Sequence, residues 1–276
     1  MNPKKNIFIS VIFTIITFAL ILSSKQNNKD YSNTNLRYIQ NEAYGFGEKL
    51  EYKVGYKFIT AGTGYFHILP KPILWNGRQC YDIRFQVKSL PSLEWIYKVK
   101  DDYRTVIDAQ GIFPWHFEQH IREGNYKRDF SATFDQVENI AITELKGEKK
   151  IYKVDKYVHD IVSAFFYVRT LDLSKFPKDT IFYLKNFYKD TTYKLGVKIL
   201  GKQTVEVEAG KFRCIIVEPL VVEGGLFKSE GKILIWLTDD DRKIPVKVGT
   251  KILIGFVGAE LTNYSGIRGP IKAKID

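Results

Sequence analysis

The sequence lacks the short motifs by which common catalytic and nucleotide-binding sites are recognised. It contains no G-x-S-x-G nucleophile elbow, no H-E-x-x-H metal-binding pair and no G-x-x-x-x-G-K-[ST] phosphate loop. The nearest approach to that loop, GGLFKSEGK over residues 224–232, has the wrong spacing and is followed by Ile233 in place of a hydroxyl residue. Because no nucleophile, base and orienting group can be assembled from the motifs present, we expect a protein that is not an enzyme.

Histidine is also scarce, with four residues in the chain. His116 and His120 stand four apart, which would suit a metal pair on a helix. However, Pro114 opposes a helix, and Trp115 and Phe117 alternate with the histidines as on a strand. At about 3.3 Å per residue the two rings would lie about 13 Å apart, too far to share an ion. We therefore predict no metal site and no cofactor.

One long hydrophobic run is present, at the N-terminus. Lys4 and Lys5 precede apolar residues from Ile7 to Leu22. At about sixteen residues, the run is long for a signal-peptide core and slightly short for a spanning helix. No cysteine follows it closely, which argues against lipoprotein processing, and the preceding positive charge predicts export of the rest. Residues 1–24 are expected to be a signal peptide or N-terminal anchor. The protein is expected in the periplasm or cell envelope, held at the inner membrane if this segment stays uncleaved.

Three further regions follow this segment. Residues 25–45 are polar and Asn-rich and predict a flexible tether. An antiparallel β-domain is expected over residues 46–266, followed by a basic tail over residues 267–276. The net charge is +11, but the lysines are scattered and form no stripe, so no nucleic acid binding is expected. Lysines on exposed sheet edges explain most of this charge, while an apolar or anionic envelope ligand remains open. Membrane contact is expected only through the N-terminal segment.

Only two cysteines are present, and a disulfide between them is permissible in an exported chain. It would stabilise the fold by ~4–5 kcal/mol in the chain-entropy model. However, Cys80 has the strand parity of the polar Asp82 and Arg84, whereas Cys214 has that of Phe212. Opposite faces disfavour a bridge, so two free thiols are the default expectation and the bridge stays open.

Apolar and polar residues alternate with period two over much of the chain between Leu50 and Tyr264, which is typical of half-buried antiparallel strands. The 17 Tyr and 19 Phe also suit pleated sheets. The acidic run from Asp239 to Asp241 is expected to be a hairpin turn. Strands are expected at about residues 46–58, 62–69, 79–88, 94–107, 112–121, 126–134, 137–145, 180–186, 190–199, 202–208, 211–222, 228–238, 243–249 and 252–264.

One segment departs from the alternation. Asp160 can cap a helix, and the residues behind it that share one helical face are Ile161, Ala164, Phe165, Val168 and Leu171. The sequence therefore predicts a mostly β protein: a large antiparallel curved sheet or incomplete barrel with one helix.

Aromatic residues are the remaining candidates for a binding site. Packed core explains most of them, but in an incomplete barrel the helix can lie across the mouth of an apolar cavity. Trp95 and Tyr97 are expected on one strand face and Trp115 and Phe117 on another. On this basis the candidate ligand-binding residues are Trp95, Tyr97, Trp115, Phe117, Phe165, Val168 and Trp236.

Four stretches together resemble a known family. They are Gly47–Tyr52 with Thr60–Gly62, Asp160–Phe165 with Arg169, Val205–Phe212, and Trp236–Asp239 with Arg242 and Pro245. In these stretches the chain resembles domain of unknown function 3108, a family of exported bacterial proteins. The resemblance implies a mostly antiparallel β-protein without an established activity, so no catalytic residue carries over. The hairpin Ile235–Val248 is also similar to one in periplasmic lipoprotein carriers, which are incomplete barrels that hold acyl chains.

Two functions follow as expectations. The first is a non-enzymatic binder of a lipid or other apolar ligand in the cell envelope. The second is a structural or protein-interaction β-domain of the envelope with a solid core. The volume enclosed by the sheet distinguishes them, because only the first needs a cavity.

Overall fold

A computed structural model describes residues 29–56, 59–188, 190–220, 232–252 and 255–275. The predicted signal peptide or anchor, residues 1–24, lies outside these residues. Within the described ranges, no helix has the length and apolar character needed to cross a bilayer. The chain divides into two compact units. The small one includes residues 29–35 and Leu74–Arg78, and the large one is formed from Leu36–Ile73 and Gln79–Asp276.

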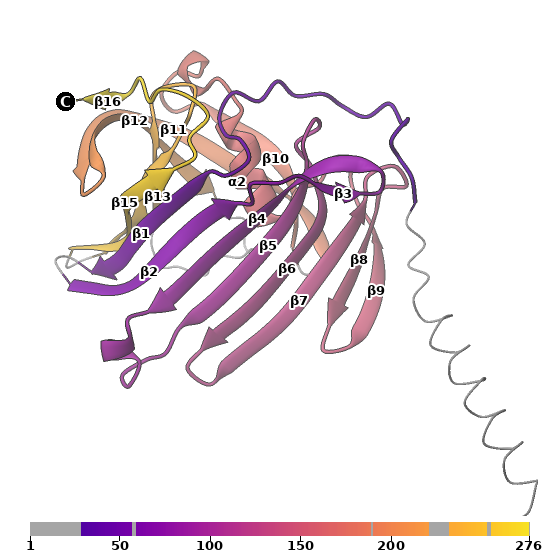
Figure 1. The fold of residues 1–276 in the computed structure, drawn as a ribbon, viewed down its shortest axis with the longest axis horizontal. Helices are drawn as coiled ribbons and strands as arrows, with labels where there is room; N and C mark the ends of the chain where they lie inside the picture. The colour runs from indigo at the N-terminus through magenta and orange to yellow at the C-terminus, as the bar shows by residue number, and fades with distance from the viewer. Residues whose placement is uncertain (1–28, 57–58, 189, 221–231, 253–254, 276) are drawn as a thin grey trace, which may run out of the picture. The chain divides into compact units, whose positions relative to one another are not determined.

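The large unit is built on an antiparallel sheet and has, among its described residues, one α-helix, α2 (Ile161–Arg169), which confirms the predicted fold class (Figure 1). The strands along the sheet follow the order β10-β11-β12-β13-β14-β15-β1-β2-β4-β5-β6-β7-β8-β9. The strands are β1 (Lys49–Tyr56), β2 (Ile59–Ile68), β3 (Ile73–Trp75), β4 (Arg78–Ser89), β5 (Lys100–Asp108), β6 (Pro114–Glu123), β7 (Tyr126–Asp135), β8 (Ile140–Leu145), β9 (Glu148–Lys153), β10 (Ile181–Tyr188), β11 (Thr191–Val207), β12 (Gly210–Leu220), β13 (Ile233–Thr238), β14 (Pro245–Ile252), β15 (Gly255–Ser265) and β16 (Lys274–Ile275).

Besides the short strands β3 and β16, which were not expected, the strand predictions differ from the structure mainly in three places. The expected strand 94–107 begins only at Lys100, after the short 3-10 helix η1 (Pro91–Leu93). The expected strands 190–199 and 202–208 are one long strand, because β11 continues through a register shift between Ile199 and Gly201. Strand β9 was not expected, since its lysine-rich sequence EKKIYK gives almost no apolar alternation.

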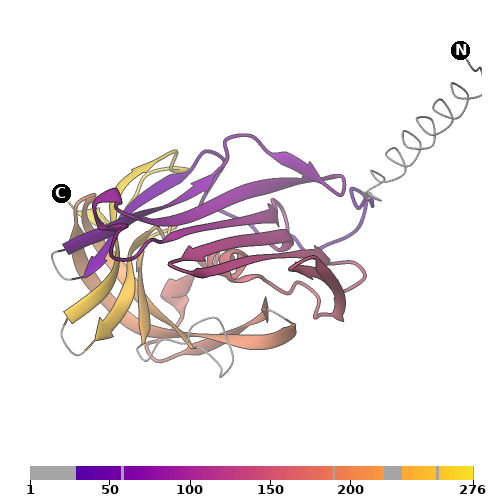
Figure 2. The same ribbon diagram turned by 90° about the horizontal axis from the view of Figure 1, so that it is seen from below.

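The sheet curves around α2 without closing into a barrel (Figure 2). Register shifts interrupt the pairing of β1 with β15 and of β1 with β2, and such bulges bend a strand and increase its twist. Strand β10, at one edge of the sheet, does not pair with β9 at the other edge but lies against His159, in the segment before α2. The backbone N–H of His159 donates to the carbonyl of Lys185 (2.9 Å), and Phe187 N–H donates to the carbonyl of His159 (2.8 Å). The ring of Phe187 also contacts Tyr152 of β9, 5.7 Å between centroids. Side chains and this segment therefore span the gap between the two edge strands.

The N-terminus of α2 is fastened to the sheet through its capping residue. Asp160 Oδ1 accepts hydrogen bonds from the backbone N–H groups of Val162 (2.8 Å) and Ser163 (2.9 Å), which confirms the predicted cap. The other carboxylate oxygen accepts a hydrogen bond from Thr105 Oγ1 on β5 (2.8 Å). One buried side chain thus both starts the helix and fixes its position.

The C-terminus of α2 is fastened by a buried ion pair. Arg169 donates from Nη1 and Nη2 to the two carboxylate oxygens of Glu48, at 2.6 Å and 3.0 Å, and neither side chain is more than 1% exposed. Arg169 Nη2 also donates to the carbonyl of Arg242 (3.2 Å), in the loop between β13 and β14. The rings of Tyr44 and Phe166 pack against its guanidinium. The helix is therefore tied to Glu48, the residue just before β1, and to the β13–β14 loop at the same point.

The segments that flank the β-domain belong to the fold more closely than predicted. Residues 36–45, expected as part of a flexible tether, lie in the large unit, where Ala43 and Tyr44 are buried. The expected basic tail folds back onto the sheet: β16 pairs with β12, and buried Ala273 donates its N–H to Asp240 Oδ2 (2.9 Å). A few apolar side chains within polar stretches account for both differences.

The acidic run forms the predicted turn, and the two cysteines are free thiols, which was the default expectation. Asp239–Asp241 forms the turn between β13 and β14, as predicted. Cys80 on β4 and Cys214 on β12 are both buried and are not joined by a disulfide. Burial, with Asp239 and Asp240 nearby, raises the pKa of the Cys214 thiol to about 12.

Breaking the buried ion pair is expected to destabilise the protein strongly. In Glu48→Gln the Arg169 guanidinium stays charged and out of water, so we expect the free energy of unfolding to fall by about 3–5 kcal/mol. The matched control is Glu51→Gln, which removes a partly exposed carboxylate that pairs with Lys49 at 2.6 Å. That control should cost less than about 1 kcal/mol. Urea unfolding of the three proteins measures both values, and equal losses would contradict this role of the pair.

Candidate functional site

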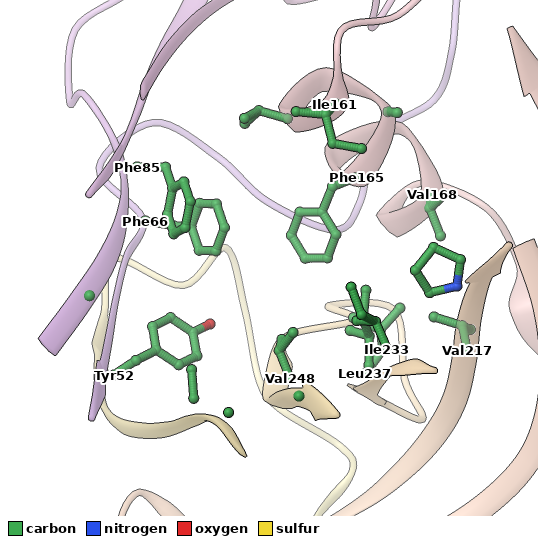
Figure 3. A pocket seen from close by; sticks show the side chains of 18 of the residues that line it. Tyr52, Phe66, Phe85, Ile161, Phe165, Val168, Val217, Ile233, Leu237 and Val248 are labelled. Carbon is green, nitrogen blue, oxygen red and sulfur yellow. The ribbon is translucent and has the colours of Figure 1, made fainter. Parts of the chain in front are cut away.

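An apolar cavity of about 470 Å³ lies between the concave face of the sheet and α2 (Figure 3). Strands β1, β2, β4, β5 and β11 to β15 contribute to its wall. On β1, β2, β4, β11, β12 and β13 the lining residues are two positions apart and alternate with residues that face the other way, as the two-residue periodicity requires. On β13, for example, Ile233, Ile235 and Leu237 line the cavity.

Helix α2 supplies one side of the cavity. Phe165 points from the helix into the space and its ring stacks on that of Phe66 (5.5 Å), which stacks in turn on Phe85 (4.4 Å). These contacts join the helix to β2 and β4 across the cavity edge. The lining residues of the helix share one face: Ile161, Val162, Ala164, Phe165 and Val168.

The described part of the cavity wall is uncharged at neutral pH. Among the described lining residues only Tyr52 and Tyr103 are ionisable. Burial raises the pKa of both phenols, well above the ordinary value for Tyr52, and the carboxylate of Asp101 adds to the effect at Tyr103. Tyr52 also uses its hydroxyl to donate a hydrogen bond to the Pro245 carbonyl (2.8 Å). The wall therefore offers apolar surface and no charge to a bound molecule.

Two of the seven residues proposed from the sequence, Phe165 and Val168, line the cavity. Their role in binding stays a prediction. Phe117 lies in the adjoining core, 6.4 Å from Tyr103 between ring centroids. Trp115 is fully buried elsewhere in the sheet, where its indole N–H donates to Asp108 Oδ2 (3.2 Å). Both residues are packed core, which was the alternative explanation for the aromatic residues.

Trp236 lies on the wrong face of its strand to line the cavity. Its neighbours Ile235 and Leu237 face the cavity, whereas the Trp236 indole donates to Gln203 Oε1 (2.9 Å) in a separate cluster. Its assignment to the binding site is therefore corrected by strand parity.

Trp95 and Tyr97 do not share a strand face, because the segment that carries them is not a strand. Pro91 begins the turn η1, and the backbone N–H groups of Ile96 and Tyr97 both donate to the Leu93 carbonyl (3.0 Å and 3.2 Å). The segment consequently coils outside the sheet. Trp95 is 83% exposed and Tyr97 55% exposed, and neither lines the cavity.

Sequence reasoning missed most of the wall, although the signal was present. Tyr52 and Val54 belong to one alternating set on β1, and Phe85 and Val87 belong to another on β4. Choosing residues by aromatic character favoured Trp236 over its aliphatic neighbours. Parity alone would have selected the correct face.

A cluster of polar side chains surrounds the start of α2, and none of them lines the cavity. The ring of buried His159 lies 3.3 Å from Ser163 Oγ through Nδ1 and 3.2 Å from Arg37 Nη2 through Nε2. Arg37 donates to the carbonyls of Gly111 (2.7 Å) and Ile112 (2.6 Å). Burial, with the nearby Arg37 charge, lowers the pKa of His159 well below its ordinary value. The imidazole is therefore neutral in the folded protein at neutral pH.

Comparison with known proteins identifies the family. The sequence pattern of the family described as "Protein of unknown function (DUF3108)" matches residues 51–262. The chain belongs to this family. The match confirms the resemblance seen in the four sequence stretches. A search of curated proteins found no match.

The fold is similar to that of a solved structure, the crystal structure of a beta-barrel-like protein of domain of unknown function DUF1849 from Brucella abortus. The TM-score is 0.52 at 11% sequence identity, and the likeness covers 81% of this chain and 99% of that chain. At this identity the likeness concerns the fold alone.

The buried His159 predicts a loss of stability in acid. Below about pH 6.5 an unfolded histidine binds a proton, whereas folded His159 stays neutral because its pKa is lowered. Wild-type stability should therefore fall by up to about 1.4 kcal/mol per pH unit until the folded-state pKa is reached. His159→Gln removes this contribution, so its disadvantage relative to wild type should shrink between about pH 7 and pH 5. Unfolding curves across that range measure it, and a constant difference would show that His159 titrates normally.

Proposed function

We propose that this protein is a non-enzymatic binder of a lipid or other apolar ligand, which it holds between α2 and the concave face of the sheet. The cavity of about 470 Å³ with its uncharged wall is the observation that supports this function. Small-molecule sites typically measure about 300–1,000 Å³ and are mostly apolar. The volume and chemistry of the cavity suit an acyl chain or a ligand of similar character.

The size of the cavity argues against a simple packing defect. Protein interiors are close-packed, and voids larger than a water molecule are few because each one forfeits contacts. An apolar ligand would regain those contacts and remove apolar surface from water at about 25 cal/mol per Å². An ionic group would instead lose its hydration without finding a partner on the wall. The cavity therefore favours apolar ligands over charged ones.

The chemistry of the wall favours binding over catalysis. Proton transfer and nucleophilic attack require a positioned acid, base or nucleophile next to the ligand. Within the described wall, the two tyrosines are the ionisable groups, and burial keeps both protonated at neutral pH. The alternative function, an envelope interaction domain with a solid core, does not explain why the cavity is present.

A role in the cell envelope is part of the same proposal. The basic residues and apolar run of residues 1–24 favour export, and the envelope is where a carrier of apolar molecules would meet lipid. Whether this segment is cleaved or retained as an anchor does not affect the cavity.

Neighbouring phenylalanines on α2 provide a matched test. Phe166 is fully buried against Tyr44, so Phe166→Ala should cost about 3–5 kcal/mol of unfolding free energy. Phe165 borders the cavity, so Phe165→Ala should cost clearly less but weaken the binding of an uncharged naphthylamine dye. Val248→Phe, which adds volume inside the cavity, should also weaken dye binding, with little loss of stability.

Dye titration and urea unfolding of wild type and the three variants measure these effects. A core-sized stability loss for Phe165→Ala with unchanged dye affinity would rule out the cavity as the binding site. Dye binding that is unaffected by Val248→Phe would lead to the same conclusion.

A further inference from the structure

One end of the sheet presents large apolar side chains to solvent. Ile59 is 64% exposed, Trp95 83%, Ile96 63%, Tyr97 55% and Tyr126 52%. They lie at or next to the β1–β2, β4–β5 and β6–β7 connections, which are at the same end of the sheet (Figure 1). We call these five residues the apolar rim. Single exposed apolar residues are ordinary, but a group on adjacent connections marks an interaction surface.

The rim is held in place by its supporting backbone. Leu90 N–H donates to the Ala61 carbonyl on β2 (2.9 Å), and Gly124 N–H donates to the Lys98 carbonyl (2.8 Å). The ring of Tyr97 lies directly over Gly124, where a side chain would collide with it. The β4–β5 loop is therefore fastened to strand β2 on one side and to the β6–β7 connection on the other.

The exposed indole of Trp95 has its N–H group hydrogen-bonded within the protein, so the ring can enter an apolar environment. Trp95 donates its indole N–H to the Ser92 carbonyl at 3.0 Å, within its own loop. Its single polar hydrogen therefore needs no water when the ring leaves the aqueous phase. Burying the ring elsewhere would cost no hydrogen bond.

The cavity extends toward the rim. Val54 and Val87 line the cavity, and each lies two residues before the end of its strand, β1 or β4, on the rim side. Thr250, which also lines it, lies near the same end of β14. Helix α2 lines the cavity as well, on the side away from the rim. The apolar space and the rim are therefore successive features along the same strands.

The residue types of the rim match the surface of a lipid bilayer. Trp and Tyr favour the interface between headgroups and acyl chains, where an apolar ring and a polar edge are both accommodated. Exposed lysines flank the rim at Lys100 and Lys127, while Lys98 pairs with Glu94 at 2.8 Å. Lysines near a bilayer are attracted by anionic headgroups.

We propose that the apolar rim docks onto the surface of an anionic lipid bilayer. This goes beyond membrane contact through the N-terminal segment, which the sequence predicts. Docking itself is independent of the proposed function. Only the further role, in which docking brings the cavity to the membrane from which its ligand comes, rests on the proposed function.

Tryptophan quenching in the full-length chain tests the docking even if the N-terminal segment itself binds lipid. The probe is vesicles of phosphatidylcholine with about 30% phosphatidylglycerol, containing lipids brominated near the headgroup. Trp115 and Trp236 are buried, so quenching of the exposed Trp95 should dominate. We expect Trp95→Phe to lose more than half of the quenching and blue shift of wild type, and the control Trp75→Phe to keep most of both.

Lysine neutralisation tests the headgroup preference. Lys100→Gln should weaken the lipid-dependent quenching about fivefold on the anionic vesicles, and clearly less on vesicles of phosphatidylcholine alone. An equal effect on both vesicles would overturn the anionic preference.

Other outcomes would overturn docking itself. Quenching that is the same in wild type and Trp95→Phe would place the rim away from the bilayer. A blue shift that grows with protein concentration without vesicles would assign the rim to a second copy of the chain. Dye binding by Trp95→Phe should equal that of wild type, so a failed docking test stays separate from a failed cavity test.

Discussion

The architecture depends on a buried ion pair between Glu48 and Arg169, which ties α2 to the residue just before strand β1. Two charges that have left water remain stable only while they stay together and hydrogen-bonded. With Asp160 holding the other end of the helix to Thr105 on β5, α2 has two fixed attachments. A helix held in this way spans the interior of an open sheet, and it leaves an apolar space on the face between its two ends.

Three of the four sequence stretches that resemble the family meet at this ion pair. The first contributes Glu48, the second Arg169, and the fourth the Arg242 carbonyl that accepts from Arg169. The remaining stretch forms the β11–β12 hairpin, where buried Phe212 packs in the same cluster as Trp236. In this chain the family signature therefore describes how the helix is mounted on the sheet. It does not describe a catalytic constellation.

Local patterns predicted the sheet, the helix and its cap, because period-two alternation and the Asp160 cap act over a few residues. The pairing of Glu48 with Arg169 was not predictable, since these residues are 121 positions apart and only the tertiary fold brings them together. The site was predicted in part. Phe165 and Val168 lie on the expected helix face, whereas Trp236 was chosen for its aromatic ring against its strand parity. Trp95 and Tyr97 were misplaced because Pro91 starts a turn where alternation suggested a strand.

The central claim is that the sheet encloses a hollow that holds an apolar molecule. Native mass spectrometry of the purified full-length protein, with and without prior incubation in a total lipid extract, tests it most directly. We expect a bound species in a molar amount comparable with the protein, which denaturation releases and Val248→Phe reduces. A spectrum that contains only the unliganded chain, even after incubation with excess lipid, would contradict it.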